Sequence, residues 1–432
     1  MNYKETLGYL FNQLPMFHRI GPAAYKANLD NTLALSRHLG EPEKKFRSIH
    51  IAGTNGKGSV ANMLASVLQQ QGYKTGLATS PHLKDFRERI RINGEMISKT
   101  AVSEFIQKHR GFFEQLNPSF FEITIALTFE FFAREQVDIA VIETGLGGRL
   151  DSTNILTPEI SIITNIGMDH MNLLGDTLEK IAAEKAGIIK EGIPIVVGKH
   201  QPGVQEVFEA VAREKNAPLH MASDSYAFFS ADTKDPGGHL VQEIIFKGPG
   251  GALNTYATDL LGVYQRENLA TVLAALDLLQ HQGLFRVTEQ ALRQGLLQVK
   301  ENTGFKGRWY QMGKRPRIIC DTGHNSDGIK MVTSQLSSLG YAKLRIVLGM
   351  VDDKDVKGVL SLFPQDATYY FCKPGVPRGL DPQKLAAAAA LEGLRGEVFT
   401  SVEAALRAAK KDASRNDLIF VGGSTFVVAE VV

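Results

Sequence analysis

The sequence contains little cysteine, with only Cys320 and Cys372 in 432 residues. So few cysteines exclude a disulfide-rich scaffold and paired-cysteine metal sites, and they are typical of a protein in a reducing cytosol. The chain also lacks any apolar run of the roughly 18–20 residues that span a membrane. Its first residues, MNYKETLGYLFNQL, are amphipathic and contain acid, unlike a signal peptide. We therefore expect a cytoplasmic protein with no membrane partner.

An excess of charge of one sign is also missing. The formal net charge is +2, and 22 % of the residues are charged. This balance argues against nucleic acid or a membrane surface as the main partner. A local basic cluster at Arg87, Arg89 and Arg91 is still suited to a small anion. A chain of this length has room for two or three domains with substantial cores.

The most informative stretch is a glycine-rich turn between an apolar strand and an amphipathic helix. Gly53, Gly56 and Gly58 lie within six residues, and apolar residues at helical spacing follow them. Such a turn directs backbone N–H groups and a helix N-terminus at one point, which suits a phosphate. Lys57 adds a positive charge, and Ser59 adds a hydroxyl that is able to bind Mg²⁺.

The spacing within this turn departs from the general P-loop pattern. That pattern has four residues between its first glycine and the Gly-Lys pair. Here Gly53 stands three residues before Gly56, and Gly58 separates Lys57 from Ser59. A tight strand-to-helix turn without a ligand is the simpler interpretation, but it requires neither the lysine nor the serine.

Strands and helices then alternate, which is the signature of an open, doubly wound α/β sheet. Three of the apolar strands end close to polar residues, namely Ser80, Glu143 and the loop Asn165–His170. In such sheets the ligand lies at the carboxyl ends of the strands. We therefore expect these groups to meet the glycine-rich turn at one edge of the sheet.

The pattern changes at two later places. Residues 223–259 contain two Pro-Gly-Gly turns between short alternating runs, which predicts a small antiparallel β-meander. The segment 299–307, VKENTGFKG, is polar with two glycines and marks a domain boundary. The predicted fold is α/β, with a P-loop doubly wound sheet domain over 1–298, a linker at 299–307 and a smaller Rossmann-like α/β domain over 308–432. Residues 1–40 are predicted to be helical, with a loop at 18–22.

The turn Ala-Gly-Thr-Asn-Gly-Lys-Gly-Ser resembles the P-loop variant of the Mur ligase superfamily. Further stretches, in order over nearly the whole chain, resemble one branch, the folylpolyglutamate synthase and dihydrofolate synthase family. These are SPHL at 80–83, ERIRING at 88–94, ETGLGGRLDSTN at 143–154, DH at 169–170, EKAG at 184–187, QREN at 265–268, GR at 307–308, DTGHN at 321–325 and GS at 423–424. One departure is Thr322, where alanine is more usual, but a small residue is kept.

This resemblance implies an ATP-dependent amide ligase. In such an enzyme a carboxylate of the pterin substrate attacks the γ-phosphate of ATP and becomes an acyl phosphate, and the amine of L-glutamate then displaces phosphate. The implied partners are small molecules, namely ATP, L-glutamate and dihydropteroate or reduced folates, and the chain is expected to be a monomer. The protein's task is to position the reactants and to neutralise charge on the transferring phosphoryl group.

The resemblance assigns the nucleotide site to the glycine-rich turn and its surroundings. Lys57 would hold the β- and γ-phosphates, and Ser59 would contact phosphate or metal. Asn268 would face the base or ribose, unless it is a plain helix N-terminal residue. The implied ATP-binding set is Gly53, Thr54, Asn55, Gly56, Lys57, Gly58, Ser59, Asn268, Arg308 and Asp321.

The implied cofactor is Mg²⁺, with two ions. Ser80 and Glu143 resemble ligands of the first ion, since Mg²⁺ prefers oxygen and keeps several waters; a solvated carboxylate is the alternative for Glu143. His170 resembles a ligand of the second, although imidazole is an unusual Mg²⁺ ligand and a lone histidine is more often structural. Lys185 resembles the lysine that is carbamylated in this superfamily, and a surface or salt-bridged lysine is the alternative.

Four residues of the second domain resemble family positions. Arg308 resembles the arginine that reaches the ATP phosphates on domain closure, although a lone arginine is by default a surface charge. Asp321 and His324 resemble residues that contact the nucleotide and help to place the glutamate, and Ser424 is a further candidate for that role. We expect a catalytic site between the domains, with residues 299–307 as the hinge.

The pterin or folate site is implied at five positions, His82, Arg89, Phe121, Asp151 and Ser152. Phe121 would stack on the ring, and Asp151 would accept its ring N–H and amino hydrogens. Core packing is the alternative for Phe121, and a loop cap is the alternative for Asp151. Phe121, Asp151 and Ser152 stand where family members with dihydropteroate activity hold the pterin ring, so the resemblance favours a bifunctional dihydrofolate synthase and folylpolyglutamate synthase, with folylpolyglutamate synthase alone as the runner-up.

Two other classes fit less well. A cell-wall Mur ligase usually carries a separate N-terminal UDP-binding domain, and only 47 residues precede Ser48. A non-catalytic nucleotide-dependent switch would leave the residue pattern of the second domain unexplained. Phosphate release that depends on glutamate and a pterin separates these classes.

Overall fold

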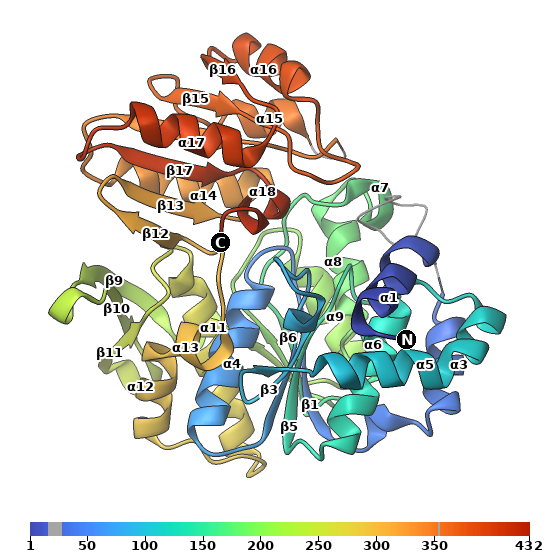
Figure 1. Cartoon of the computed structure of the whole chain (residues 1–432). Helices are drawn as coiled ribbons and strands as arrows, with labels where there is room; N and C mark the ends of the chain where they lie inside the picture. The colour runs from blue at the N-terminus through green and yellow to red at the C-terminus, as the bar shows by residue number, and fades with distance from the viewer. Residues whose placement is uncertain (16–27, 353–354) are drawn as a thin grey trace. The chain divides into compact units, whose positions relative to one another are not determined.

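Figure 1 shows the fold as a computed structural model, which describes residues 1–15, 28–352 and 355–432. The predicted loop at 18–22 lies outside the described residues. The chain divides into two compact units, Met1–Asp259 with Tyr264–Phe305, and Leu260–Val263 with Lys306–Val432. Within the predicted linker, α13 (Val299–Thr303) is helical and belongs to the first unit.

The first unit is built on an eight-stranded sheet. Its order is β4 (Glu95–Met96), β3 (Ile90–Ile92), β2 (Thr75–Ala78), β5 (Ile139–Glu143), β1 (Arg47–Ala52), β6 (Ile160–Ile163), β7 (Ile195–Val197) and β8 (Leu219–Met221). The strands from β2 to β8 pair in parallel, and β3 and β4 form an antiparallel hairpin at the edge. The doubly wound α/β sheet predicted from the sequence is therefore confirmed.

Helices cover both faces of this sheet, because its central strands are largely apolar and must be buried on both sides. On one face Ala140 and Ile142 join the core of α5 (Lys99–Leu116) and α6 (Phe120–Arg134), and further along Ile163 joins that of α8 (Leu178–Ala186) and α9 (Gln205–Glu214). The opposite face is covered by α4 (Lys57–Gln70) and α11 (Gln265–His281), which also contact each other. Further helices of this unit include α1 (Tyr3–Gly8), the π-helix Tyr9–Gln13, α3 (Asp30–His38), α7 (Met171–Leu174), α10 (Ala222–Ser225) and α12 (Glu289–Leu297).

The carboxyl edge of the sheet gathers the loops that carry the predicted site residues of this unit. Parallel pairing sets Ile51 opposite Glu143 and Ala52 opposite Ile163. The loops that leave β1, β5 and β6 therefore start side by side, and the loop after β2 joins them through the pairing of Ala78 with Ile142. This is the edge at which doubly wound sheets bind ligands.

The predicted meander is also confirmed. Strands β9 (Ala227–Lys234), β10 (Val241–Lys247) and β11 (Leu253–Thr258) form an antiparallel sheet in the order β11–β10–β9. Its two Pro-Gly-Gly segments lie in the connections, with Gly237 and Gly250 at positive φ. This sheet contacts α11 and α12.

The second unit is a six-stranded sheet in the order β12 (Tyr310–Lys314), β13 (Arg317–Asp321), β17 (Leu418–Gly422), β14 (Leu344–Leu348), β15 (Thr368–Phe371) and β16 (Gly396–Val398). All strands but β12 pair in parallel. Its helices are α14 (Ser326–Ser337), α15 (Val356–Leu360), α16 (Pro382–Leu391), α17 (Val402–Asp412) and α18 (Thr425–Ala429). No helix of the described residues is long and apolar enough to cross a membrane.

Candidate active site

The glycine-rich turn follows β1 directly, and α4 begins at Lys57. Gly53 has φ 147° and Gly56 has φ 91°, a backbone region that favours glycine. Space also requires glycine at both positions. A Cβ on Gly53 would stand 1.9 Å from Thr164 Oγ1, and one on Gly56 would stand 2.3 Å from Asn268 Oδ1. The glycines are therefore needed for both conformation and close packing.

Hydrogen bonds attach this turn to the loop after β6. Thr54 N donates to Asn165 O at 2.8 Å, and Asn55 N donates to Asn165 Oδ1 at 2.9 Å. Gly167 N donates to Thr54 Oγ1 at 2.9 Å. Because these bonds join segments more than one hundred residues apart, the turn is held by the sheet edge and not only by its own sequence.

Two lysines share one carbonyl of the turn. Lys57 Nζ donates to Gly53 O at 2.9 Å and to Thr54 O at 3.3 Å. Lys185 Nζ, from α8, also donates to Gly53 O at 2.9 Å. Lys185 is only 4 % exposed, so it is not a surface lysine. Burial, reinforced by the charge of Lys57, lowers the pKa of Lys185 to about 7.

Glu143 and Ser80 lie together beside the start of α4. Ser80 N donates to Glu143 Oε2 at 3.1 Å, and Glu143 is 6 % exposed. A Cβ on Gly58 would stand 3.8 Å from Glu143 Oε2, so the carboxylate faces the first turn of the helix. Glu143 is thus a buried group at the turn and not a solvated strand end.

The donor set fits an oxygen-binding cation that keeps other ligands. No group of three or more His, Cys, Asp or Glu that would hold a metal occurs in the described part of the chain. One carboxylate and one hydroxyl, Glu143 and Ser80, would leave most of a Mg²⁺ shell to water and phosphate oxygens. The residues therefore suit a divalent cation that binds oxygen ligands.

His170 lies in the loop after β6, at φ 52°. Its backbone N donates to Asp169 Oδ1 at 2.9 Å, and its Nε2 lies 3.9 Å from Asp169 Oδ2. The side chain is 28 % exposed. The loop is attached to the turn through Asn165, so His170 and the turn belong to the same edge.

The start of α11 packs on the other side of the turn. Asn268 Nδ2 donates to Gln265 Oε1 at 2.7 Å, and Gln265 Nε2 donates to Ser59 Oγ at 3.2 Å. Both amide residues are buried. Asn268 therefore contacts Gly56 and supports the turn. Gln265 stands in the QREN stretch, but nothing in the local spacing of the sequence predicts its contact with Ser59.

The predicted pterin residues fall into two groups. Phe121 lies against Gly145, since a Cβ there would be 2.4 Å from the Phe121 ring. The next residue, Leu146, donates its N–H to Asp151 Oδ2 at 2.7 Å. Phe121 and Asp151 thus border the same loop after β5. Ser152 is buried and begins the short 3₁₀ helix Ser152–Ile155, which Asp151 caps by accepting Thr153 N at 3.0 Å.

The second group consists of His82 and Arg89. Arg89 Nε donates to His82 Nδ1 at 2.7 Å, and the guanidinium lies 5.3 Å from the Phe120 ring centroid. Burial lowers the pKa of Arg89 to about 10, opposed by Glu143 and Glu88. Arg89 is thus a buried cation between an aromatic ring and the Glu143 site.

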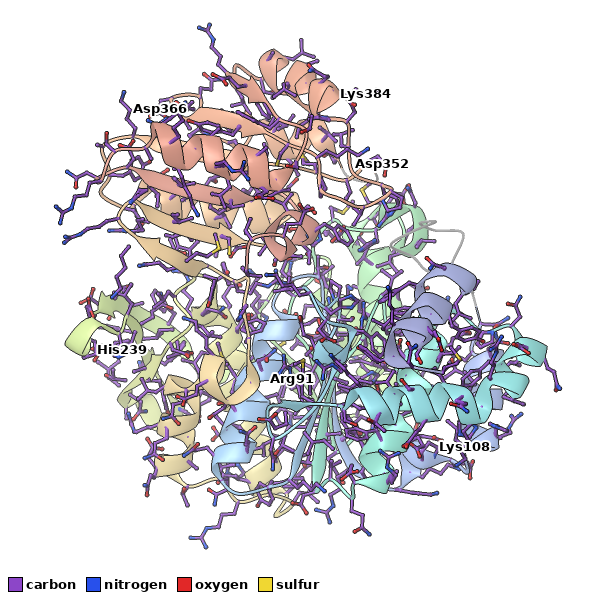
Figure 2. All side chains as sticks on the ribbon, viewed as in Figure 1. Arg91, Lys108, His239, Asp352, Asp366 and Lys384 are labelled. Atoms are coloured by element: carbon purple, nitrogen blue, oxygen red, sulfur yellow. The ribbon has the colours of Figure 1, made fainter. Side chains whose placement is uncertain are left out.

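The basic cluster indicated by the sequence does not form an open anion site. Arg87 pairs with Asp85 at 2.7 Å. Arg91, labelled in Figure 2, donates to Gly94 O at 2.8 Å, and its guanidinium lies against Gly304. With Arg89 bound to His82, each of the three arginines has a partner inside the first unit.

A buried histidine that the sequence analysis missed supports Asp151. His50 is 0 % exposed on β1, and its Nε2 lies 2.7 Å from Thr153 Oγ1. The Thr153 hydroxyl in turn donates to Asp151 Oδ1 at 2.6 Å. Burial lowers the pKa of His50 to about 3, so the ring is neutral and donates from Nε2. His50 and Thr153 therefore orient the Asp151 carboxylate.

Removing the Thr153 hydroxyl, which links His50 to Asp151, is expected to destabilise the fold. Thr153→Val leaves a buried His50 N–H without its acceptor and Asp151 without one donor, so the free energy of unfolding should fall by about 1–3 kcal/mol. Urea unfolding measures the change. Thr153→Ser, which keeps the hydroxyl, is the control and should retain most of the stability. Equal stability of the valine variant and the natural chain would contradict the role given to Thr153.

In the second unit, Asp321 organises the residues that the sequence predicted there. Its Oδ2 accepts Trp309 N at 2.7 Å and its Oδ1 accepts Gly323 N at 2.7 Å. These bonds fix the backbone on either side, next to Arg308 and His324. His324 Nδ1 lies 3.0 Å from Thr322 O. Ser424 caps α18 by accepting Phe426 N at 3.0 Å, and β13 and β17 pair so that Asp321 lies opposite Gly422. The predicted set therefore shares the carboxyl edge of this sheet.

Two protein families match consecutive parts of this chain. The Mur ligase middle domain family matches residues 51–276, and the Mur ligase glutamate ligase domain family matches residues 307–425. A dihydrofolate synthase/folylpolyglutamate synthase of Bacillus subtilis is 36 % identical over 343 residues, with 78 % of each chain covered.

Two solved structures are similar to this chain over its full length. Escherichia coli FolC in complex with DHPP and ADP matches with a TM-score of 0.85 at 30 % identity, covering 100 % of this chain and 97 % of that one. The bifunctional folylpolyglutamate synthase/dihydrofolate synthase of Yersinia pestis, complexed with AMPPNP and a Mn ion, matches with a TM-score of 0.81 at 28 % identity, covering 100 % and 97 %.

Proposed function

Because the chain belongs to the folylpolyglutamate synthase/dihydrofolate synthase family of the Mur ligases, we propose that the site at its sheet edge ligates L-glutamate to dihydropteroate and to reduced folates. The chain is an ATP-dependent glutamate ligase, and its relatives include the bifunctional enzymes of Bacillus subtilis and Yersinia pestis. The observation that carries the assignment is the convergence of the glycine-rich turn, Lys57, Ser80 and Glu143 at one buried edge.

The reaction divides into two balanced steps. The substrate carboxylate attacks the γ-phosphorus of ATP, the bond to the β-phosphate oxygen breaks, and ADP leaves with both electrons of that bond. The amine of glutamate then attacks the acyl carbon, an amide bond forms, and phosphate and a proton are released. Activation is needed because a carboxylate is a poor electrophile.

The chain's own groups perform positioning and charge neutralisation. The N–H groups at the start of α4 and the Lys57 ammonium would face the phosphates of a bound nucleotide, because Gly53 and Gly56 allow the backbone to turn closely there. A divalent cation held by Ser80 and Glu143 would neutralise charge on the β- and γ-phosphates when bound. We assign His170 to a second cation and place the ADP leaving group at the turn.

Lys185 is proposed to carry a carbamate. Its amine is buried and hydrogen-bonded to Gly53 O, and its pKa of about 7 leaves much of it neutral near neutral pH. A neutral amine attacks CO₂ and loses one proton, which gives a carbamate anion. The anion would replace a buried cation next to Lys57 with a group able to orient a cation or its water.

The pterin is assigned to the surface bordered by Phe121, Asp151 and Ser152. Phe121 offers an aromatic face beside Gly145, and Asp151 is held by Thr153 and Leu146. Arg308, His324 and Ser424 are assigned to nucleotide and glutamate from the second unit. A folylpolyglutamate synthase without dihydropteroate activity is the second candidate on substrate.

One assay tests the function. Phosphate release is measured with ATP and L-glutamate, with dihydropteroate, tetrahydrofolate or a UDP-muramoyl peptide as acceptor. Release with both pterins supports the bifunctional ligase, and release with tetrahydrofolate alone supports the second candidate. Release with the muramoyl peptide alone would overturn the proposal, and so would the lack of phosphate release with any of the three acceptors.

Truncating Phe121 is expected to weaken pterin binding selectively. Loss of a stacked ring costs about 1–3 kcal/mol, so Phe121→Ala should raise KM for dihydropteroate by roughly tenfold or more while KM for ATP stays unchanged. Steady-state kinetics with each substrate varied measure this. Phe131→Ala, a half-buried phenylalanine on the same helix α6, is the matched control. An equal rise in KM in both variants would mean that Phe121 acts only through packing.

A further inference from the structure

A hollow of about 440 Å³ lies in the second unit, at the edge opposite its predicted ligand-binding residues. Strands β13, β14 and β17 begin there, at Arg317, Leu344 and Leu418, whereas Asp321 is at the carboxyl end of β13. The residues that line the hollow are Lys314, Arg315, Arg317, Gly340, Tyr341, Ala342, Arg415, Asn416, Asp417 and Leu418. The hollow is therefore built by three loops at the amino ends of parallel strands and is separate from the site assigned above.

The lining carries an excess of positive charge. It contains four cations, Lys314, Arg315, Arg317 and Arg415. None of the four forms an ion pair in the part of the chain that the structure describes. The single carboxylate of the lining, Asp417, is buried, and its Oδ2 accepts Arg345 Nε at 3.1 Å and Ser414 N at 3.0 Å. Asp417 is thus paired with Arg345 and forms no ion pair with any of the four cations.

The backbone holds these loops in fixed register. Lys314 pairs with Arg317 across the hairpin of β12 and β13, and Arg317 lies opposite Leu418 in parallel register. Ala342 N donates to Asn416 O at 2.9 Å, and Leu418 N donates to Lys343 O at 3.0 Å. The four cations lie on adjoining loops of the lining and none is in an ion pair among the described residues, so they repel one another and a bound anion would relieve this repulsion.

We propose that this hollow binds a compact polyphosphate group, the class that includes inorganic polyphosphates and the phosphate chains of nucleotides. Guanidinium forks match phosphate oxygens in pairs, and three of the four cations are arginines. The volume is in the usual range of small-molecule sites, roughly 300–1,000 Å³. An oligo-γ-glutamate spreads its carboxylates along a long chain and would satisfy fewer cations at once in a hollow of this size.

Tyr341 adds a neutral donor to the lining. Burial raises the pKa of its hydroxyl, and the charge of Asp366, labelled in Figure 2, acts in the same direction. The hydroxyl therefore keeps its proton and is able to donate to a phosphate oxygen. Asn416, also in the lining, carries an amide NH₂ that is able to act as a second neutral donor.

Titration calorimetry with inorganic tripolyphosphate tests the proposal. The full-length chain carries Lys57→Ala in every experiment, which weakens phosphate binding at the glycine-rich turn. The measured heat then reports binding at the hollow. Arg315→Ala with Arg415→Ala, both at exposed positions, is expected to raise Kd at least tenfold. Lys384→Ala with Lys410→Ala removes the same charge from exposed positions outside the lining and should change Kd less than twofold. Arg317→Ala is a second variant and should weaken binding in the same direction.

Three outcomes would overturn the assignment. One is the same Kd in the hollow variant and the control, since binding would then follow overall charge. Another is tighter binding of tri-γ-glutamate than of tripolyphosphate, with loss in the arginine variant, which would assign the hollow to a polycarboxylate. The third is affinity for single-stranded oligonucleotides that rises with their length, which would make the hollow part of an extended nucleic-acid surface. Because binding and not turnover is measured, failure here leaves the proposed ligase function unaffected.

Discussion

Glu143→Gln is expected to reduce kcat/KM for phosphate release on the order of 10³-fold, while the fold is retained. Glutamine has the same shape and keeps an oxygen that is able to accept Ser80 N, the bond seen at 3.1 Å. It removes only the negative charge. A cation between this group and the phosphates would lose its charged protein ligand, and Ser80 and water are left to hold it.

The loss should depend on the concentration of Mg²⁺. A weakened cation site shifts the apparent Mg²⁺ requirement upward, by about tenfold or more, whereas a purely structural role for Glu143 would lower activity equally at every concentration. Steady-state rates at several Mg²⁺ concentrations separate the two cases. Glu159→Gln, at the amino edge of the same sheet and 3.7 Å from Arg47, is the matched control and should keep full activity. Full activity of Glu143→Gln at limiting Mg²⁺ would show that Glu143 does not hold the cation.

Much of the arrangement of the glycine-rich turn, Ser80 and Glu143 was predictable from the sequence, because it depends on local backbone requirements. Gly53 and Gly56 need positive φ, and apolar strands followed by Ser80 and Glu143 place those residues at the carboxyl edge of any parallel sheet. The two Pro-Gly-Gly turns indicated the meander for the same reason. The roles proposed for Lys185 and Arg308 rest on family resemblance, because residue spacing alone does not indicate them.

What sequence reasoning missed depends on contacts between distant segments. His50 reads as one polar residue in an apolar strand, and only the fold brings it to Thr153. Gln265 meets Ser59 across 206 positions of the chain. Residues Leu260–Val263 belong to the second unit because Gln335 holds them there, with Val263 N donating to its Oε1 at 2.8 Å. None of these contacts leaves a periodic pattern in the sequence.

The pH dependence of Lys185 follows from its burial. The pKa of about 7 in the folded chain lies below the ordinary lysine value of 10.5, so between these values the unfolded chain holds a proton that the folded chain does not. The free energy of unfolding therefore rises with pH through this window. The same deprotonation leaves an amine able to react with CO₂, so carbamate formation should also increase as the pH rises through about 7.

Lys185→Arg is therefore expected to reduce kcat by about 10²-fold or more, because a guanidinium stays charged and forms no carbamate. Lys185→Gln, neutral and of similar length, should lose activity as well, which separates the need for an anion from the need to remove a cation. Lys180→Arg on the same helix α8, exposed and paired with Asp176 at 2.7 Å, is the control and should stay active.

The natural enzyme supplies the second half of this test. Dialysis against CO₂-free buffer should lower its activity, and added bicarbonate should restore it, whereas the Lys185 variants should not respond. Intact-protein mass spectrometry after trapping of the carbamate should show the mass of one added CO₂ in the natural chain alone. If activity does not change when bicarbonate is added and the Lys185→Arg variant is active, the carbamate is ruled out. Lys185 would then be a buried amine that only holds Gly53 O in place.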